Sequence, residues 1–300
     1  MRKILLLAAA TALVVAVGTA AAKTVAVSIT KDGFVPSSAA LVQGDTVQFK
    51  NNDTVAHQIM FKPTTGVTCA PAPLVLQPGI TGSCTFRSTG NFNYEDPNTR
   101  GNTFRGSVRV AAAPASLSVS ARPLLVTYGA SAVLTGTLST QAVGENIDVL
   151  AQACGAPSAT RTATVKTTTG GAYTATVKPL QRTTYTTKSK ALTSSVAAVR
   201  VRPRLRLVRV AAHRYSIRVL ASRSFAGKYA SFQRYNGTLR RWVAVKSVRL
   251  KANSTGVAPT VVTSASFRSS VRGGLRVRTT LSQTAVGSCY APGLSNTIRS

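Results

Sequence analysis

The chain has 300 residues and a formal net charge of +30, because 37 Lys and Arg stand against only 7 Asp and Glu. With two histidines and seven acids there is little material for general acid–base catalysis. The sequence also contains no G-x-S-x-G, H-E-x-x-H or phosphate-binding Gly-Lys-Ser/Thr motif. These facts argue against an enzyme, and we expect no small-molecule substrate.

The N-terminus has the pattern of a secretory signal peptide. Arg2 and Lys3 precede an apolar run at 4–17, and small residues follow up to Ala22. The run is shorter than the ~20 residues that span a bilayer, which favours cleavage over an uncleaved anchor. We therefore expect a signal peptide at 1–22 and a secreted or extracytoplasmic cell-envelope protein, in which disulfides are permitted.

Alternating apolar and polar residues predict β-strands in the first hundred residues. Val25, Val27 and Ile29 alternate with polar neighbours, as in a half-buried strand. Further strands are expected within 44–53 and at 83–86, 92–94 and 106–110. Strands at this spacing, with a turn at LQPG between them, suggest a β-sandwich over 23–112.

After a linker rich in Ala and Pro, two further β-rich segments follow, which we expect to be domains at 113–202 and 203–300. The clearest signal is a hairpin at 230–250 with its turn at Asn236-Gly237. The stretches 164–177 and 245–262 echo each other in order and residue type. We therefore predict an all-β chain that ends in a diverged tandem pair of Ig-like sandwiches, with a single larger β-domain as the alternative.

A series of short motifs runs through 24–110. In order, they are GFVP at 33–36, GDTVQFKNNDTVAH at 44–57, LQPG at 76–79, TF at 85–86, G-x-F-x-Y at 90–94 and G-x-V-x-V at 106–110. In order and spacing this series resembles the cupredoxins, the family of the blue copper proteins. The resemblance implies a Greek-key β-sandwich, copper binding and electron transfer.

The resemblance also implies where copper ligands would stand. The family places a histidine after the N-x-D turn, where this chain has His57, and Cys, His and usually Met in the loop before the last strand. Here that loop, 94–106, has Asp96 at the cysteine position and contains no His or Met. A type 1 site needs a thiolate and two imidazoles, so we expect no complete site and no cofactor.

Two interpretations of His57 remain open at this stage. It is either a polar loop residue at the end of the sandwich, or part of a vestigial metal site with Asp96 and Glu95. The oxygen ligands of such a site would favour Zn(II) or Cu(II) over Cu(I).

The four cysteines suggest structural cross-links. Cys69 and Cys84 flank one turn within the first unit, and a bridge between them would add ~3 kcal/mol on the chain-entropy model. Cys154 and Cys289 lie one in each later unit. They either join those units or remain free thiols.

The positive charge is concentrated at the end of the chain, since 203–300 holds 18 Lys and Arg and no Asp or Glu. The candidate anion-binding residues are Arg200, Arg202, Arg204, Arg206, Arg240, Arg241, Arg276 and Arg278. Arginines at intervals of two share a face of an extended strand, which suits an anionic envelope polymer or an anionic membrane surface. The alternative is that cations on edge strands prevent aggregation between sheets.

Together these patterns predict an exported, non-enzymatic binding or scaffold protein of the cell envelope or extracellular space. Export argues against chromosomal nucleic acid as a partner. Electron transfer by the first unit and adhesion to surface glycans are the alternatives.

Overall fold

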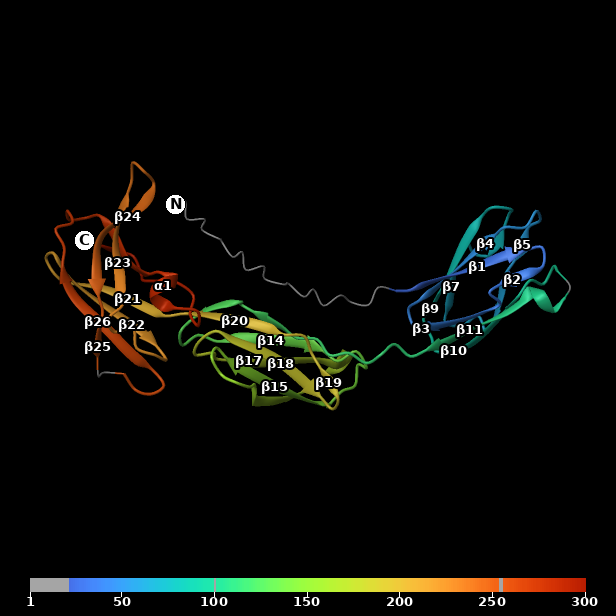
Figure 1. Cartoon of the computed structure of the whole chain (residues 1–300), viewed down its shortest axis with the longest axis horizontal. Coiled ribbons are helices and arrows are strands. Elements are labelled where there is room, and N and C mark those ends of the chain that lie inside the picture. The colour runs from blue at the N-terminus through green and yellow to red at the C-terminus, as the bar shows by residue number, and fades with distance from the viewer. Residues whose placement is uncertain (1–21, 100, 254–255) are drawn as a thin grey trace, which may run out of the picture. The chain divides into compact units, whose positions relative to one another are not determined.

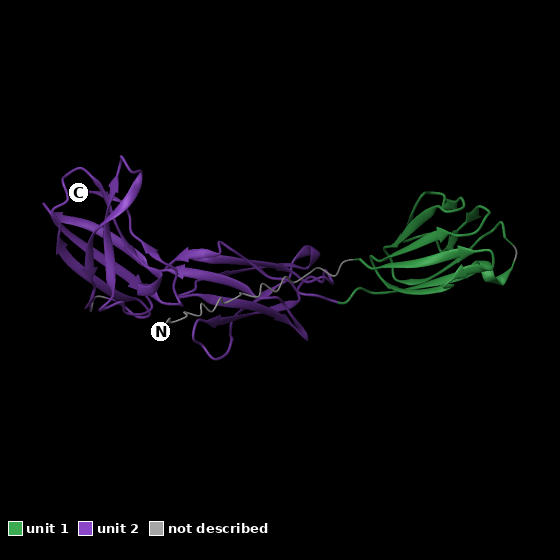
Figure 2. Ribbon diagram, turned by 45° about the horizontal axis from the view of Figure 1, so that its top comes forward, with its two compact units in different colours: residues 1–114 green, residues 115–300 purple. Residues whose placement is uncertain are grey.

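The computed structural model describes residues 22–99, 101–253 and 256–300. The predicted signal peptide therefore lies outside the described residues, except for Ala22. The described chain is almost entirely β-structure and divides into two compact units, residues 1–114 and 115–300 (Figures 1 and 2). No helix in the described ranges is long and apolar enough to cross a membrane.

We call the described part of the first unit the head, and it consists of two main sheets. The first sheet has the order β2 (Gly33–Val35), β1 (Thr24–Thr30), β4 (Thr46–Asn51), β9 (Thr81–Phe86) and β7 (Val67–Ala70). The second has the order β3 (Ser38–Val42), β11 (Arg105–Ala111), β10 (Gly90–Glu95) and β6 (Met60–Lys62). A short pair, β5 (His57–Gln58) and β8 (Val75–Leu76), and the 3-10 helix η1 (Asn102–Phe104) complete the head.

The alternation predicted from the sequence sets the core of the head. Val27 and Ile29 on β1 and Phe49 on β4 turn inward and meet Phe92 and Val108 of the second sheet in one buried cluster. Six aromatic rings in this cluster pack mostly edge to face, a favoured geometry for ring quadrupoles; they belong to Phe34, Phe49, Phe61, Phe86, Phe92 and Tyr94. Cys69 and Cys84 lie directly opposite each other on β7 and β9 and form a disulfide.

The first half of the second unit, 115–202, is here called the middle sandwich. One of its sheets has the order β12 (Ser120–Arg122), β14 (Ala132–Thr137) and β17 (Ala172–Val177). The other has β13 (Leu125–Thr127), β20 (Ala197–Arg202), β18 (Thr183–Ser189), β15 (Asn146–Ala153) and β16 (Thr160–Lys166), with β19 (Leu192–Thr193) beside β18. The 3-10 helix η2 (Thr169–Gly171) lies between β16 and β17.

The second half, 203–300, is called the basic sandwich. Its first sheet has the order β21 (Arg204–Ala211), β22 (Arg214–Ala221), β26 (Val261–Arg268) and β25 (Lys251–Asn253). Its second has β24 (Arg241–Arg249), β23 (Tyr229–Asn236), β27 (Arg276–Leu281) and β28 (Gly293–Leu294), with β29 (Ile298–Arg299) also on β27. The predicted hairpin is β23–β24, although its loop is Gly237–Arg240 rather than a turn centred on Asn236-Gly237. The α-helix of this sandwich is the single turn α1 (Gln283–Val286).

The middle and basic sandwiches repeat one strand plan. The β15–β16 hairpin corresponds to β23–β24, and β18 lies beside β15 as β27 lies beside β23. Both hairpins carry a register shift after a buried residue, Val149 in one and Phe232 in the other. A shared irregularity of this kind is a structural feature and not a defect. It supports the internal repeat that the sequence suggested.

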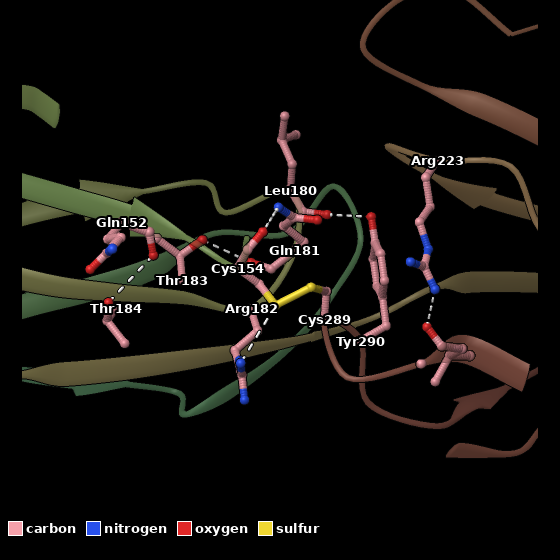
Figure 3. The surroundings of a disulfide bond; sticks show 12 residues. Gln152, Cys154, Leu180, Gln181, Arg182, Thr183, Thr184, Arg223, Cys289 and Tyr290 are labelled. Atoms are coloured by element: carbon pink, nitrogen blue, oxygen red, sulfur yellow. Dashed lines mark hydrogen bonds between the residues drawn. A yellow bond between two sulfur atoms is a disulfide. The ribbon is translucent and has the colours of Figure 1, made fainter. Parts of the chain in front are cut away.

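Covalent and polar contacts join these two sandwiches within the second unit (Figure 3). Cys154 and Cys289 form a disulfide, and Arg182, which follows β17, donates its N–H to the Cys289 carbonyl at 2.9 Å. The Tyr290 hydroxyl, from the basic sandwich, donates to the Leu180 carbonyl at 3.0 Å. One buried apolar cluster runs through both sandwiches, so they share a core as well as a bridge.

A close approach in the head gives a test of its packing. Tyr94 lies opposite Gly106 across β10 and β11, and its hydroxyl donates to the Ser37 carbonyl at 3.2 Å. A Cβ at position 106 would overlap both the Tyr94 ring and that carbonyl. We expect Gly106→Ala to lower the free energy of unfolding of the head by about 1–3 kcal/mol, the usual cost of overpacking.

The measurement is calorimetric or denaturant unfolding of the full chain. Gly237→Ala is the control, because no described atom lies within 4 Å of a Cβ built at Gly237. The control should change stability by no more than about 0.5 kcal/mol. Equal effects of the two substitutions would contradict this account of the Tyr94–Gly106 pair.

Candidate functional site

The turn before His57 is held by a buried amide. Asn51, at the end of β4, is fully buried and donates from Nδ2 to the carbonyls of Val55 and Leu76, both at 2.8 Å. Its Oδ1 accepts the N–H of Asp53 at 2.9 Å. Because all of these partners are backbone groups, the N-x-D turn has one geometry and fixes where His57 enters the sandwich.

His57 lies between two carboxylates. Its Nδ1 is 2.7 Å from Asp96 Oδ2, and its Nε2 is 3.0 Å from Asp53 Oδ2. The histidine is 1% exposed, and its ring stacks on Phe104 with centroids 5.1 Å apart. The imidazole is therefore enclosed at both nitrogens and on one face.

Asp96 is itself fixed by the loop that follows it. Asp96 Oδ2 also accepts from the Thr99 hydroxyl at 2.9 Å, and Oδ1 accepts the N–H of Asn98 at 2.9 Å. The side chain has no exposed surface, so these bonds replace the water that an ionised carboxylate would otherwise bind. The position where the cupredoxin pattern has a cysteine thus holds a buried, fully bonded carboxylate.

Each ring nitrogen of His57 lies within hydrogen-bond distance of a carboxyl oxygen. Asp53, the more accessible of the two acids, has its pKa lowered chiefly by the hydrogen bond from His57 and next by the N–H of Thr54. Its contribution to stability is therefore present above the ordinary carboxyl pKa of about 4 and is lost as the pH falls through the lowered value.

The three candidate metal ligands are only partly brought together. His57 and Asp96 are in contact, but Glu95 points to Lys62 Nζ at 2.6 Å and Arg105 Nε at 3.7 Å. Lys62 first and Arg105 less strongly lower the pKa of Glu95. Asp53, which was not among the predicted ligands, lies at the second ring nitrogen instead. The sequence feature that could have identified Asp53 as a partner of His57 is its position four residues earlier, within the N-x-D turn.

The residues present do not fit a type 1 copper site. All four cysteines are in disulfides, and both nitrogens of His57 are already hydrogen-bonded to carboxylates. In the described part of the chain, no group of three or more His, Cys, Asp or Glu side chains is arranged to hold a metal ion. A thiolate and two imidazoles are the minimum for that centre, so we derive no copper chemistry for the head.

The Asp53–His57–Asp96 cluster should make a large contribution to the stability of the head. His57→Ala leaves the buried Asp96 carboxyl without its imidazole partner, and we expect a loss of about 3–5 kcal/mol in the free energy of unfolding. Chemical denaturation at neutral pH measures this. Adding Asp96→Asn to His57→Ala should recover part of the loss, because it removes the carboxyl group that has lost its partner.

Glu95→Gln is the matched control for this cluster. Its ion-pair partners are exposed, with the Lys62 side chain 71% and the Arg105 side chain 66% accessible. Exposed pairs of this kind contribute about 0–1 kcal/mol. If His57→Ala cost no more than Glu95→Gln, the buried cluster would not stabilise the head more than an exposed pair does.

The lack of a free thiolate also predicts how the head responds to copper. Adding Cu(II) to the full oxidised chain should produce no intense blue charge-transfer band, because that band requires a copper–thiolate bond. Visible absorption during a Cu(II) titration is the measurement. A stoichiometric blue complex that disappears in His57→Ala would show that the disulfides or the carboxylates rearrange to admit the metal.

The run 199–210 is divided between two sheets in the second unit. Pro203 separates β20 of the middle sandwich from β21 of the basic sandwich, so Arg200 and Arg202 belong to one sheet and Arg204 and Arg206 to another. Arg204 and Arg206 are exposed on β21, an edge strand. Arg202 is half-buried, and within the described chain its Nε has no hydrogen-bond partner. The four residues therefore do not form one continuous stripe.

The remaining candidate arginines lie on the second sheet of the basic sandwich. Arg240 and Arg241 are exposed where the β23–β24 loop enters β24. Arg276 and Arg278 lie on β27, and Arg278 Cζ is 4.1 Å from the centre of the Trp242 ring. Burial lowers the pKa of the Arg278 guanidinium from its ordinary value. The charge of Arg278 thus lies next to an aromatic ring.

Comparison with known proteins gives limited information. No family model matches the chain, and no curated protein matches it. A purple cupredoxin from Nitrosopumilus maritimus is similar in structure at 20% identity and a TM-score of 0.25, over 29% of this chain and 99% of that chain. An oxidised amicyanin variant is similar at 24% identity and a TM-score of 0.23, over 29% of this chain and 81% of that chain. Similarity at this level carries no ligand over to this chain.

Proposed function

We propose that this chain is an exported, non-enzymatic binding or scaffold protein of the cell envelope or extracellular space, whose basic sandwich binds anionic polymer. The observation that carries the proposal is the 18 Lys and Arg of 203–300 with no acidic residue among them. Such a field of one sign attracts polyanions at low salt and weakens as the ionic strength rises.

The placement of the charged side chains supports a surface role. On the first sheet of the basic sandwich, Arg214 on β22 lies directly opposite Arg268 on β26, and both are exposed. Like charges in directly opposed positions destabilise a sheet. These exposed arginines therefore do not stabilise the fold, which suggests that they have a role at the surface. An anionic ligand across this face would offset the repulsion.

In this proposal the remaining parts of the chain have structural roles. The cupredoxin-like head serves as a stable module without a copper centre. The two sandwiches of the second unit are Ig-like, which their common strand plan supports. The two disulfides fit an oxidising compartment, in agreement with the signal-peptide pattern.

Charge reversal on one exposed strand tests the proposal. We expect Arg204→Glu with Arg206→Glu, made in the full chain, to elute from an immobilised heparin column at lower salt than the wild type. The slope of log affinity against log salt should also fall by about two, one for each cation removed from contact.

The control reverses two exposed lysines of the head, Lys31→Glu with Lys50→Glu, and changes the net charge by the same amount. It should leave elution nearly unchanged, because contacts in the basic sandwich remain. Equal elution of all three proteins would mean that the arginines only protect the β21 edge against aggregation. Equal loss in both variants would assign binding to total charge and not to this surface.

A further inference from the structure

The second sheet of the basic sandwich carries an aromatic and cationic cluster on β23, β24 and β27. Tyr235 and Trp242 lie directly opposite each other on β23 and β24, with ring centroids 5.4 Å apart. Arg276 and Arg278 come from the neighbouring strand β27. We call these four residues the Trp242 cluster, and all four keep exposed surface.

The two guanidinium groups lie over the two aromatic rings. Arg278 Cζ is 4.1 Å from the Trp242 centroid, and Arg276 Cζ is 5.3 Å from the Tyr235 centroid and 6.0 Å from that of Trp242. Gln233 Oε1 also accepts from Arg278 Nε at 3.0 Å. Cation–π contacts of this kind hold a guanidinium in place without a carboxylate.

A stacked guanidinium remains available to an anion. Stacking uses the face of the group, whereas its N–H donors lie in its plane and point outward. Arg276 and Arg278 are two residues apart on one strand, so their side chains share a face about 7 Å apart. The cluster therefore presents two fixed donor groups at a regular spacing.

The basic sandwich supplies no acidic side chain that could compete with a ligand for the guanidinium groups of the cluster. Arg299 on β29 lies directly opposite Arg276 and adds a further cation on this face of the sheet. The basic sandwich contains no Asp or Glu at all. The outward N–H groups are thus surrounded by further positive charge, which favours a ligand that carries repeated negative groups.

We propose that the Trp242 cluster is a specific binding site for an acidic polysaccharide, whose carboxylate or sulfate groups are bound by the stacked guanidiniums of Arg276 and Arg278. This inference rests on the proposed function and narrows it to one site and one ligand class. Bidentate, in-plane hydrogen bonding to an oxyanion is the strongest contact that arginine offers.

The arrangement of the rings favours a polysaccharide over single-stranded nucleic acid. Nucleic acid bound on such surfaces stacks its bases on aromatic faces. Here Arg278 covers a face of Trp242 and Arg276 lies over Tyr235, while the two rings meet edge to face at 63°. A ring face covered by a guanidinium is not open for a base to stack on. The groups left for recognition are the guanidinium edges, which bind carboxylate or sulfate groups.

A charge-preserving substitution distinguishes specific binding at the Trp242 cluster from attraction by the net positive charge of the basic sandwich. Arg276→Lys with Arg278→Lys keeps the net charge but removes both the stacking and the planar donor fork. In the full chain we expect its affinity for heparin and for polygalacturonate to fall about tenfold or more. Arg204→Lys with Arg206→Lys, on the other sheet, is the matched control and should stay within about twofold of the wild type.

Further probes identify the ligand class and verify folding. Single-stranded oligothymidine and vesicles containing anionic phosphatidylglycerol should lose much less affinity than heparin does in Arg276→Lys/Arg278→Lys, because the covered rings offer no stacking surface to a base and the lipid surface is attracted by the net charge. Trp242→Leu should weaken heparin binding in the same way, since it removes the ring that orients Arg278. The thermal midpoint of each variant shows that the sandwich is folded.

The outcomes discriminate between the site and the function on which it rests. If both lysine variants bind heparin like the wild type, the site is refuted while the anionic-partner function stands. If the wild type binds none of the polyanions, the function fails and the site with it. If oligothymidine or vesicles lose as much affinity as heparin in Arg276→Lys/Arg278→Lys, the assignment to polysaccharide is overturned.

Discussion

The absence of Asp and Glu from 203–300 is the constraint that organises the second half of this protein. Its cations must be stabilised by other groups, and the structure uses aromatic faces and backbone carbonyls. Arg223 lies over Phe225 and Tyr290, and Lys246 donates to the Arg268 carbonyl. Among the described residues, all salt bridges lie outside this segment and all cation–π contacts lie inside it. Because these partners carry no full negative charge, the positive field is left uncancelled at the surface.

The head differs in composition, since two carboxyl groups there share one imidazole. The ring of His57 is buried with Asp96, and the backbone groups around Asn51 hold the turn that brings Asp53 to the other nitrogen. A buried pair is costly unless its remaining hydrogen bonds are satisfied, and here Thr99 and Asn98 complete the shell of Asp96. The loop that ligates metal in the cupredoxin pattern is thus held here by hydrogen bonds from Asp96 to His57, Asn98 and Thr99.

Sequence periodicity predicted the strands that have one buried face. The alternation at Val25, Val27 and Ile29 became β1, and the hairpin at 230–250 became β23–β24. The two-residue strands β5 and β8 are too short to show a period, so they could not be foreseen. The Trp242 cluster was also beyond prediction, because its register depends on a bulge after Phe232 and on β27 from forty residues later along the chain. The partnership of Asp53 with His57 depends on a turn held by side-chain contacts, which periodicity does not report.

The disulfide between Cys154 and Cys289 has a mechanical consequence. When the second unit is stretched between its two ends, the tension enters at Ala115 and reaches Cys154, then crosses the covalent bridge directly to Cys289. Cys154 and Cys289 are separated by 135 positions in the sequence, so 134 residues lie between them. These residues carry no tension, because the disulfide transmits the force directly from one cysteine to the other. That protected loop contains β21 to β27 and therefore the whole Trp242 cluster. In a protein anchored at one end and pulled at the other, force could therefore not extend the segment that carries this cluster as long as the disulfide is intact.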